Sequence, residues 1–196
     1  MIRKLATAFN ATLRRFRRHD GATAAVEFAL IMPFLLSLYF GSMEGSALFT
    51  ADRRVNTISA TMGDLVSQWD PDDGPLSIST TLTDYFAAAQ SLMFPMTTTS
   101  LKQVVTYVQV KSDGTTVIVW SKGYNGGTPR TVGNSYPLAS TKMMNQVARG
   151  GYIICAEVYY SYKPLLAQVF TSSLNLYHEN IYLPRFGNTA QITLGT

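Results

Sequence analysis

Glu27 is the residue of this sequence whose type and position most need a chemical explanation. It is the one charged side chain between Ala22 and Met43, a run rich in Phe, Leu and Ile. A carboxylate inside a membrane is costly, and such groups usually face a protein partner or a water-filled path. Two interpretations follow. Either Glu27 lies close enough to the lipid headgroups to stay hydrated, or it pairs with a positive group inside an assembly.

The other candidates for chemistry are weaker. Cys155 and His178 have the types of a nucleophile and a base, but no third group that would orient the base is evident. Cys155 lies in the apolar stretch 152–156, which is typical of a buried strand, so a small buried hydrophobic side chain is expected there. A single cysteine also excludes an internal disulfide.

Metal and phosphate chemistry are not indicated either. Two histidines exclude a multi-histidine metal site. The glycine-rich stretch 123–129 lacks the lysine and the following helix of a phosphate-binding loop, so a turn is expected there. We therefore expect no enzymatic activity, no cofactor and no metal. Four further charged residues are expected to be solvated: Glu44, Arg130, Lys142 and Arg149. For Glu44 a packing role is the alternative.

The apolar run around Glu27 predicts a membrane-spanning helix. The 22 residues of 22–43 would extend about 33 Å as a helix, which is enough to cross a bilayer core. Pro33 removes one helical hydrogen bond and predicts a kink, which membrane helices tolerate. A cleavable signal peptide is the alternative, with small residues at 41–42 or 45–47 as the cleavage site. Against it, the helical pattern continues towards Trp69.

The positive charge of the chain is concentrated in its first 20 residues. The formal net charge is +4, yet six basic residues and Asp20 give this segment +5 and leave the remainder at −1. Such a tail can bind nucleic acid, but beside an apolar helix it favours a cytoplasmic flank that fixes orientation. Four arginines lie nearest the helix: Arg14, Arg15, Arg17 and Arg18. We expect a cytoplasmic N-terminus, a C-terminal part outside the cytoplasm and no nucleic-acid partner.

Three segments follow from these patterns: a basic stub (1–21), a long helix (22–68) and an α+β domain (69–196). Val55, Ile58 and Met62 recur at helical spacing, so the outer half of the long helix is expected to pack on the domain. Two prolines and a glycine in 69–75 end it.

The domain is expected to contain a mostly antiparallel sheet. Asp113-Gly114 predicts a hairpin between strands at 101–111 and 115–122. The strongest central strand is 152–162, with Tyr160 and Tyr162 on one face and Tyr159 on the other. Further elements are helices at 79–91 and near 138–148, and extended pieces at 170–183 and 189–194.

Residues 17–33 resemble the TadE-like family of tight-adherence (Flp) pilus assembly proteins. The similar features are a basic stub, a Gly-Ala step, the sequence Val-Glu-Phe-Ala-Leu, a short apolar spacer and Pro33. Gly41 and Glu44 stand where the family has a later glycine and glutamate. The resemblance covers about 14–60 well and is loose at 157–165 and 180–185.

The resemblance implies a minor pilin-like (pseudopilin) protein of the bacterial inner membrane. Its implied partners are other pilins and minor pilins, the inner-membrane assembly platform, a prepilin peptidase and membrane lipid. Glu27 and Phe28 are the residues implied in charge pairing and assembly. The pairing group would be a free α-amine made by cleavage near Gly21 or Ala22.

Processing is the feature in which this sequence departs from the family. Some members are cut after the glycine, which leaves the glutamate fifth. Counting from Ala22, Glu27 is sixth. Cleavage between Ala22 and Thr23 would restore the fifth place; otherwise the chain is an uncleaved anchor.

Two functions are therefore expected of this chain. The first is an assembly protein that primes, caps or contacts a pilus. The alternative is a membrane-anchored periplasmic binding domain whose N-terminal helix is only a tether.

Overall fold

The computed structural model describes residues 20–137, 148–164, 172–186 and 191–195, and side chains from Thr23 onward. The chain divides into two compact units, and the boundary falls within helix α2 (Asp20–Ser67), between Ser46 and Ala47. The predicted helix near 138–148 lies almost entirely outside the described residues.

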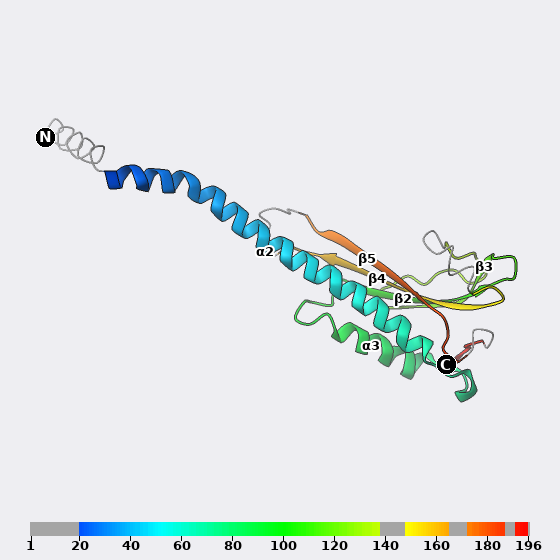
Figure 1. The fold of residues 1–196 in the computed structure, drawn as a ribbon. Helices are drawn as coiled ribbons and strands as arrows, with labels where there is room; N and C mark the ends of the chain where they lie inside the picture. Colours follow the sequence, from blue (N-terminus) through cyan, green and yellow to red (C-terminus); the bar gives the residue numbers. More distant parts are fainter. Residues whose placement is uncertain (1–19, 138–147, 165–171, 187–190, 196) are drawn as a thin grey trace. The chain divides into compact units, whose positions relative to one another are not determined.

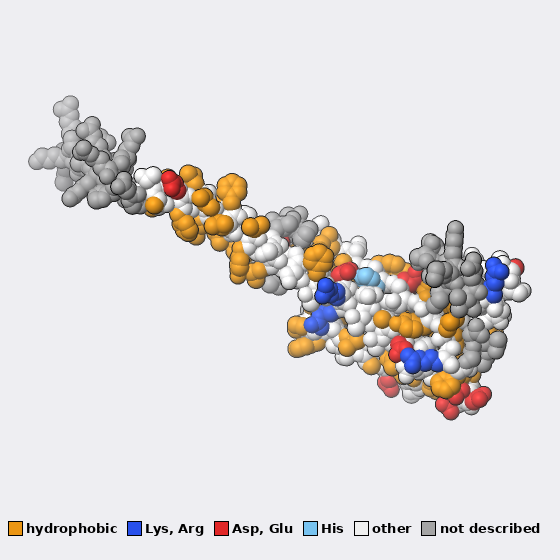
Figure 2. Space-filling view, viewed as in Figure 1, with side chains coloured by type: hydrophobic (Ala, Val, Ile, Leu, Met, Phe, Trp, Pro, Cys, Tyr) orange, Lys and Arg blue, Asp and Glu red, His pale blue; other side chains and the backbone are white. Residues whose placement is uncertain are grey.

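The described part of the first unit is the beginning of α2. The helix is unbroken through Pro33, and large hydrophobic side chains are exposed along it, as Figure 2 shows. Two hydroxyl groups are satisfied within the helix, because Ser37 Oγ donates to Pro33 O at 2.8 Å and Ser42 Oγ donates to Tyr39 O at 2.8 Å. By length and composition, α2 is able to cross a membrane.

The second unit is an α+β domain built on a four-stranded antiparallel sheet, which confirms the predicted fold class (Figure 1). The spatial order of its strands is β3-β2-β4-β5. Their bounds are Leu101–Val110 for β2, Thr116–Tyr124 for β3, Gly151–Tyr162 for β4 and Leu174–Tyr182 for β5. A short parallel pair joins β1 (Leu76–Ser77) to β6 (Leu194–Gly195).

Helical elements cover one face of this sheet, which we call the inner face. They are the second half of α2, a π-helical turn (Ile78–Leu82) and α3 (Thr83–Ser91), whereas a 3-10 turn (Pro71–Asp73) that follows α2 has no buried residue. Val55, Ile58 and Met62 of α2 are buried in one cluster with inward side chains of β2 and β4, as the helical spacing predicts. Ser59 adds a polar link, since its Oγ donates to Ala156 O at 2.7 Å.

The sheet also has a smaller buried cluster on its other face, the outer face. Ile153 and Cys155 of β4 contribute to it, together with Val108, Val110, Ile118, Tyr136 and Ala148. Strand alternation places neighbouring residues of β4 on opposite faces. Tyr160 and Tyr162 belong to the inner core and Tyr159 lies on the other face, as predicted, where its side chain is partly exposed.

The glycine-rich stretch after β3 forms a tight turn. Gly127 N–H donates to Tyr124 O at 3.0 Å, and the two central residues, Asn125 and Gly126, both have positive φ, at 51° and 78°. Asn-Gly suits this geometry, which resembles a type I′ turn. The expected turn is confirmed, and the chain after it returns along the outer face towards Arg130.

Candidate functional site

Glu27 lies on an exposed, apolar part of α2. Its side chain is exposed, as are those of its neighbours Val26 and Phe28, and Phe28 has 60% of its surface accessible. Glu27 is the one charged residue between Thr23 and Met43, a range that the structure describes in full. The helix therefore presents a single negative group on a surface suited to lipid or to other apolar helices.

The remaining predicted residues of this region are described unevenly. Thr23 is exposed near the start of α2, and the backbones of Gly21 and Ala22 are already helical. The orienting residues Arg14, Arg15, Arg17 and Arg18 lie outside the described residues. The kink at Pro33 stays a prediction, because the helix continues through that residue.

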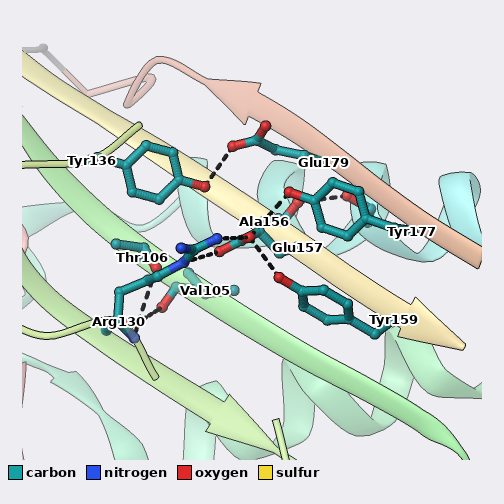
Figure 3. A network of polar contacts seen from close by, with 11 residues as sticks. Val105, Thr106, Arg130, Tyr136, Ala156, Glu157, Tyr159, Tyr177 and Glu179 are labelled. Carbon is teal, nitrogen blue, oxygen red and sulfur yellow. Dashed lines mark hydrogen bonds and ion pairs between the residues drawn. The ribbon is translucent and has the colours of Figure 1, made fainter. Parts of the chain in front are cut away.

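A second polar site lies on the outer face of the sheet and is centred on Glu157. This β4 residue is only 1% exposed. Arg130 binds it through two bonds, Nε to Oε2 at 3.0 Å and Nη2 to Oε1 at 2.5 Å. The hydroxyl groups of Tyr159 and Tyr177 also donate to Oε1, at 2.9 and 3.1 Å (Figure 3). Arg130 was expected to be solvated, and that prediction is wrong, since the turn before it directs its side chain onto a buried carboxylate.

The strand register explains this convergence. Tyr159 and Tyr177 are directly opposed between β4 and β5, and their ring centroids are 4.9 Å apart. Glu157 and Glu179 are also opposed on these strands. Tyr136 OH donates to Glu179 Oε1 at 2.5 Å, so the second carboxylate also has a partner (Figure 3).

Burial is the largest influence on the Glu157 carboxyl and acts to raise its pKa, but the bonds from Arg130, Tyr159 and Tyr177 outweigh it, so the pKa lies below its usual value. Burial and the adjacent carboxylate raise the pKa of Tyr159 to about 12 and also raise the pKa of Tyr177. At neutral pH these phenols are donors and Glu157 is an ionised acceptor.

A groove of about 720 Å³ adjoins this network. One wall is formed by residues of the returning segment, including Thr128, Pro129 and Asn134, and the other by Tyr159, Asn175 and Tyr177. Because Arg130 is already paired, the groove offers neutral hydrogen-bonding groups, tyrosine rings and the ammonium group of Lys102.

Cys155 and His178 do not form a catalytic pair. Cys155 contributes to the outer cluster, and burial raises the pKa of its thiol. His178 opposes Val158, an inner-core residue, and its Nε2 lies 2.8 Å from Asp52 Oδ1 of α2. The two side chains are therefore on opposite faces of the sheet. Among the described residues, no group of three His, Cys, Asp or Glu side chains is placed to hold a metal.

Residues 22–61 match the family described as TadE-like protein. The chain carries a TadE-like segment. This finding confirms the resemblance, and the matched range contains Glu27, Phe28, Pro33, Gly41 and Glu44. Neither a curated protein nor a solved structure gives a significant match to the chain.

The TadE-like segment implies involvement in the assembly of a tight-adherence pilus, with partners that belong to that pilus. The match ends at residue 61, within α2, so the looser similarity near the C-terminus is not part of it. The outer-face network and its groove lie beyond the segment.

Glu44 of the TadE-like segment differs from expectation. It was predicted to be solvated, but it is 2% exposed, and the prediction is wrong. Sequence position relative to the apolar run was a poor guide, because a charge at the end of a span can also be covered by protein.

Sequence reasoning also missed Glu157. The available signal was the same as for Glu27: a lone carboxylate in an otherwise apolar stretch, here 152–160. Its partner Arg130 could not be found in this way, since the two residues are 27 positions apart.

Proposed function

We propose that this chain is a minor pilin-like component of a tight-adherence pilus and contributes to its assembly, priming or capping at the bacterial inner membrane. The observation that carries the proposal is Glu27, exposed on an apolar helix within the TadE-like segment. Such a helix can pack against the helices of other pilins, which would bury both its apolar surface and its one charge.

The role proposed for Glu27 is charge pairing during assembly. A carboxylate at the centre of a membrane helix costs about 2.5–3.5 kcal/mol on insertion scales, and the cost is smaller near the end of a span, where Glu27 lies. Pairing with the free N-terminal amine of a neighbouring pilin would offset this cost. Because other positions along the helix offer no such gain, the pair would also fix the axial register of the two helices.

The proposed topology has a cytoplasmic N-terminus and a periplasmic second unit. Six basic residues precede the span, whereas Arg53 and Arg54 are the nearest basic residues after it. The excess of Lys and Arg on the N-terminal side favours retention of that side in the cytoplasm. The chain would then meet other pilins, the assembly platform, lipid and, if it is processed, a prepilin peptidase.

Catalysis has no part in this proposal, in which the protein acts through packing and charge pairing. The alternative is a membrane-anchored periplasmic binding domain, and the groove of about 720 Å³ beside Tyr159 and Tyr177 is the observation that favours it. In that case α2 would serve only as a tether.

Exchange of residues 22–43 for an unrelated membrane helix of equal length separates the two functions. An assembly role predicts loss of pili while the protein still fractionates with the inner membrane. A tether predicts normal function after the exchange, and that result would remove the assembly proposal. Membrane fractionation of the exchanged protein is the control for insertion.

A further inference from the structure

The second unit exposes large apolar side chains close to where it follows the membrane helix in sequence. Phe49 of α2 is 70% exposed, and in the loop after α3 Leu92 is 38% and Phe94 is 78% exposed. We call these three residues the apolar collar. All of them belong to the second unit.

Arg54 fixes the loop against α2. Its Nη1 donates to Leu92 O at 2.7 Å and also to Phe94 O. Met93, between the two exposed residues, is completely buried in the inner core. The loop is thus held by a core side chain and by an arginine, and the exposure of Phe94 is a feature of an ordered structure.

The three collar residues therefore lie at a similar height along the axis of α2, since the loop that carries Leu92 and Phe94 is bound to the helix at Arg54. Phe49 precedes Arg54 by five residues, which is about 7.5 Å along a helix axis. The two positions lie on different sides of the helix, since five residues correspond to about 140° of rotation. A protein partner would contact residues on the same side of the helix. A bilayer surface surrounds the helix, so residues on different sides can enter it together when they lie at the same height along the axis.

This level is also where α2 changes from an apolar to a charged surface. From Phe28 to Ala51 the one charged residue is Glu44, which is buried, and the next charged side chains are Asp52, which is 43% exposed and lies beside His178, and the exposed Arg53. The 22 residues from Phe28 to Phe49 would extend about 33 Å, close to the thickness of a bilayer core. Glu27 and Arg53 then flank the two edges of the apolar surface.

The charges of the second unit agree with this placement. Arg53 is exposed at the level of the collar, and Asp52 Oδ1 lies 2.8 Å from His178 Nε2. Three further acidic residues, Asp70, Asp72 and Asp73, come after the C-terminal end of α2. Positive charge at the collar suits the phosphate groups of a phospholipid surface.

We propose that the collar inserts into the outer interface of the phospholipid bilayer, with Arg53 beside the headgroup phosphates, so that the second unit rests on the membrane. This inference depends on the proposed anchoring of α2. It moves the span outward from 22–43 to about 28–49, and it leaves Glu27 at the inner headgroup edge until an assembly partner binds it.

Nitroxide labels read by electron paramagnetic resonance test the placement in the full-length protein, reconstituted in phosphatidylethanolamine–phosphatidylglycerol vesicles. Cysteines are introduced singly as Phe94→Cys, as Val132→Cys, an exposed position in the segment on the outer face, and as Phe34→Cys within the span. Native Cys155 is buried, and labelling of the unmodified chain measures its background. Circular dichroism checks that each variant is folded.

The proposal predicts that the label at Phe94 collides severalfold more with oxygen, relative to a water-soluble nickel chelate, than the label at Val132. Equal access of the chelate to both labels would overturn it. Shielding of the Phe94 label from both reagents would also overturn it, because that result indicates a protein partner. If the Phe34 label collides mainly with oxygen while the Phe94 label gives either of these results, the collar proposal fails and the membrane anchor stands. If the Phe34 label collides mainly with the nickel chelate, both the anchor and the collar proposals fail.

Discussion

Arg130 and Glu157 form a bidentate ion pair on the outer face of the sheet, with N···O distances of 3.0 and 2.5 Å. Arg130 comes from the segment that follows the Asn125-Gly126 turn, and Glu157 comes from the centre of β4. The pair therefore fastens an irregular segment to a regular sheet. It also explains how a carboxylate that is 1% exposed stays ionised.

Arg130→Met should destabilise the second unit, because it leaves the Glu157 carboxylate buried without its cation. Loss of one partner of a buried pair typically costs about 3–5 kcal/mol. We expect about 2–3 kcal/mol here, since 35% of the Arg130 side chain is exposed and solvent screens it. Urea unfolding followed by tryptophan fluorescence measures the change. The exposed Arg149, changed to Met, is the matched control, and equal stability of the two variants would contradict the pairing.

Acidification should remove the contribution of the Glu157 carboxylate to the free energy of unfolding. The folded pKa of Glu157 lies below its usual value of 4.5, so its contribution is present above that pH and is lost as the pH falls through the folded pKa. Glu157→Gln removes the contribution. The difference in free energy of unfolding between native and variant protein should therefore shrink from about pH 7 to about pH 3. A difference that stays constant over this range would argue against an ionised Glu157.

Gly63 of α2 lies against the ring of Tyr182 of β5. A Cβ atom at this position would lie 2.5 Å from Tyr182 Cδ2 and 3.4 Å from Ala156 Cβ. Gly63→Ala should therefore lower the stability, although Ala favours a helix by about 1 kcal/mol over Gly. Gly45→Ala in the same helix meets no atom within 4 Å, and it should cause no loss. Thermal unfolding compares the two, and a Gly63→Ala protein as stable as Gly45→Ala would show that the helix does not approach the strand this closely.

The sheet was predictable because its signals are local. Val, Thr and aromatic residues around Asp113-Gly114 identify β2 and β3, and the apolar run 152–162 identifies β4. The helical spacing of Val55, Ile58 and Met62 also identified the face of α2 that packs on the sheet. In contrast, β1 has only two residues, and its partner β6 is more than 100 residues later in the sequence. A strand this short leaves no periodic pattern.

The polar sites were less predictable because they depend on contacts between distant segments. Arg130, the partner of Glu157, is positioned by a turn and by the path of the chain after that turn. Neither feature shows in the sequence which carboxylate Arg130 will bind. Glu44 shows the same limit, since an expected position near a membrane surface does not determine whether protein covers the side chain. Glu27 could be singled out because its signal needs no partner: one charge in a long apolar helix.

Processing of the N-terminus makes a separate prediction. Cleavage by a prepilin peptidase that keeps the glutamate fifth should give a mature chain that starts at Thr23, and cleavage after Gly21 should give a start at Ala22. Intact-mass analysis of the membrane-extracted protein distinguishes these products. A start at Met1 would remove the processing proposal and would leave the chain as an uncleaved anchor.

The central claim is tested most directly by piliation of cells that express Glu27→Ala at native levels. Ser37→Ala is the matched control, because it removes another exposed polar group from the same helix. The account predicts that Glu27→Ala abolishes pili, that Ser37→Ala retains them, and that both proteins remain in the inner membrane. Normal pili in the Glu27→Ala strain would contradict the proposed pairing role.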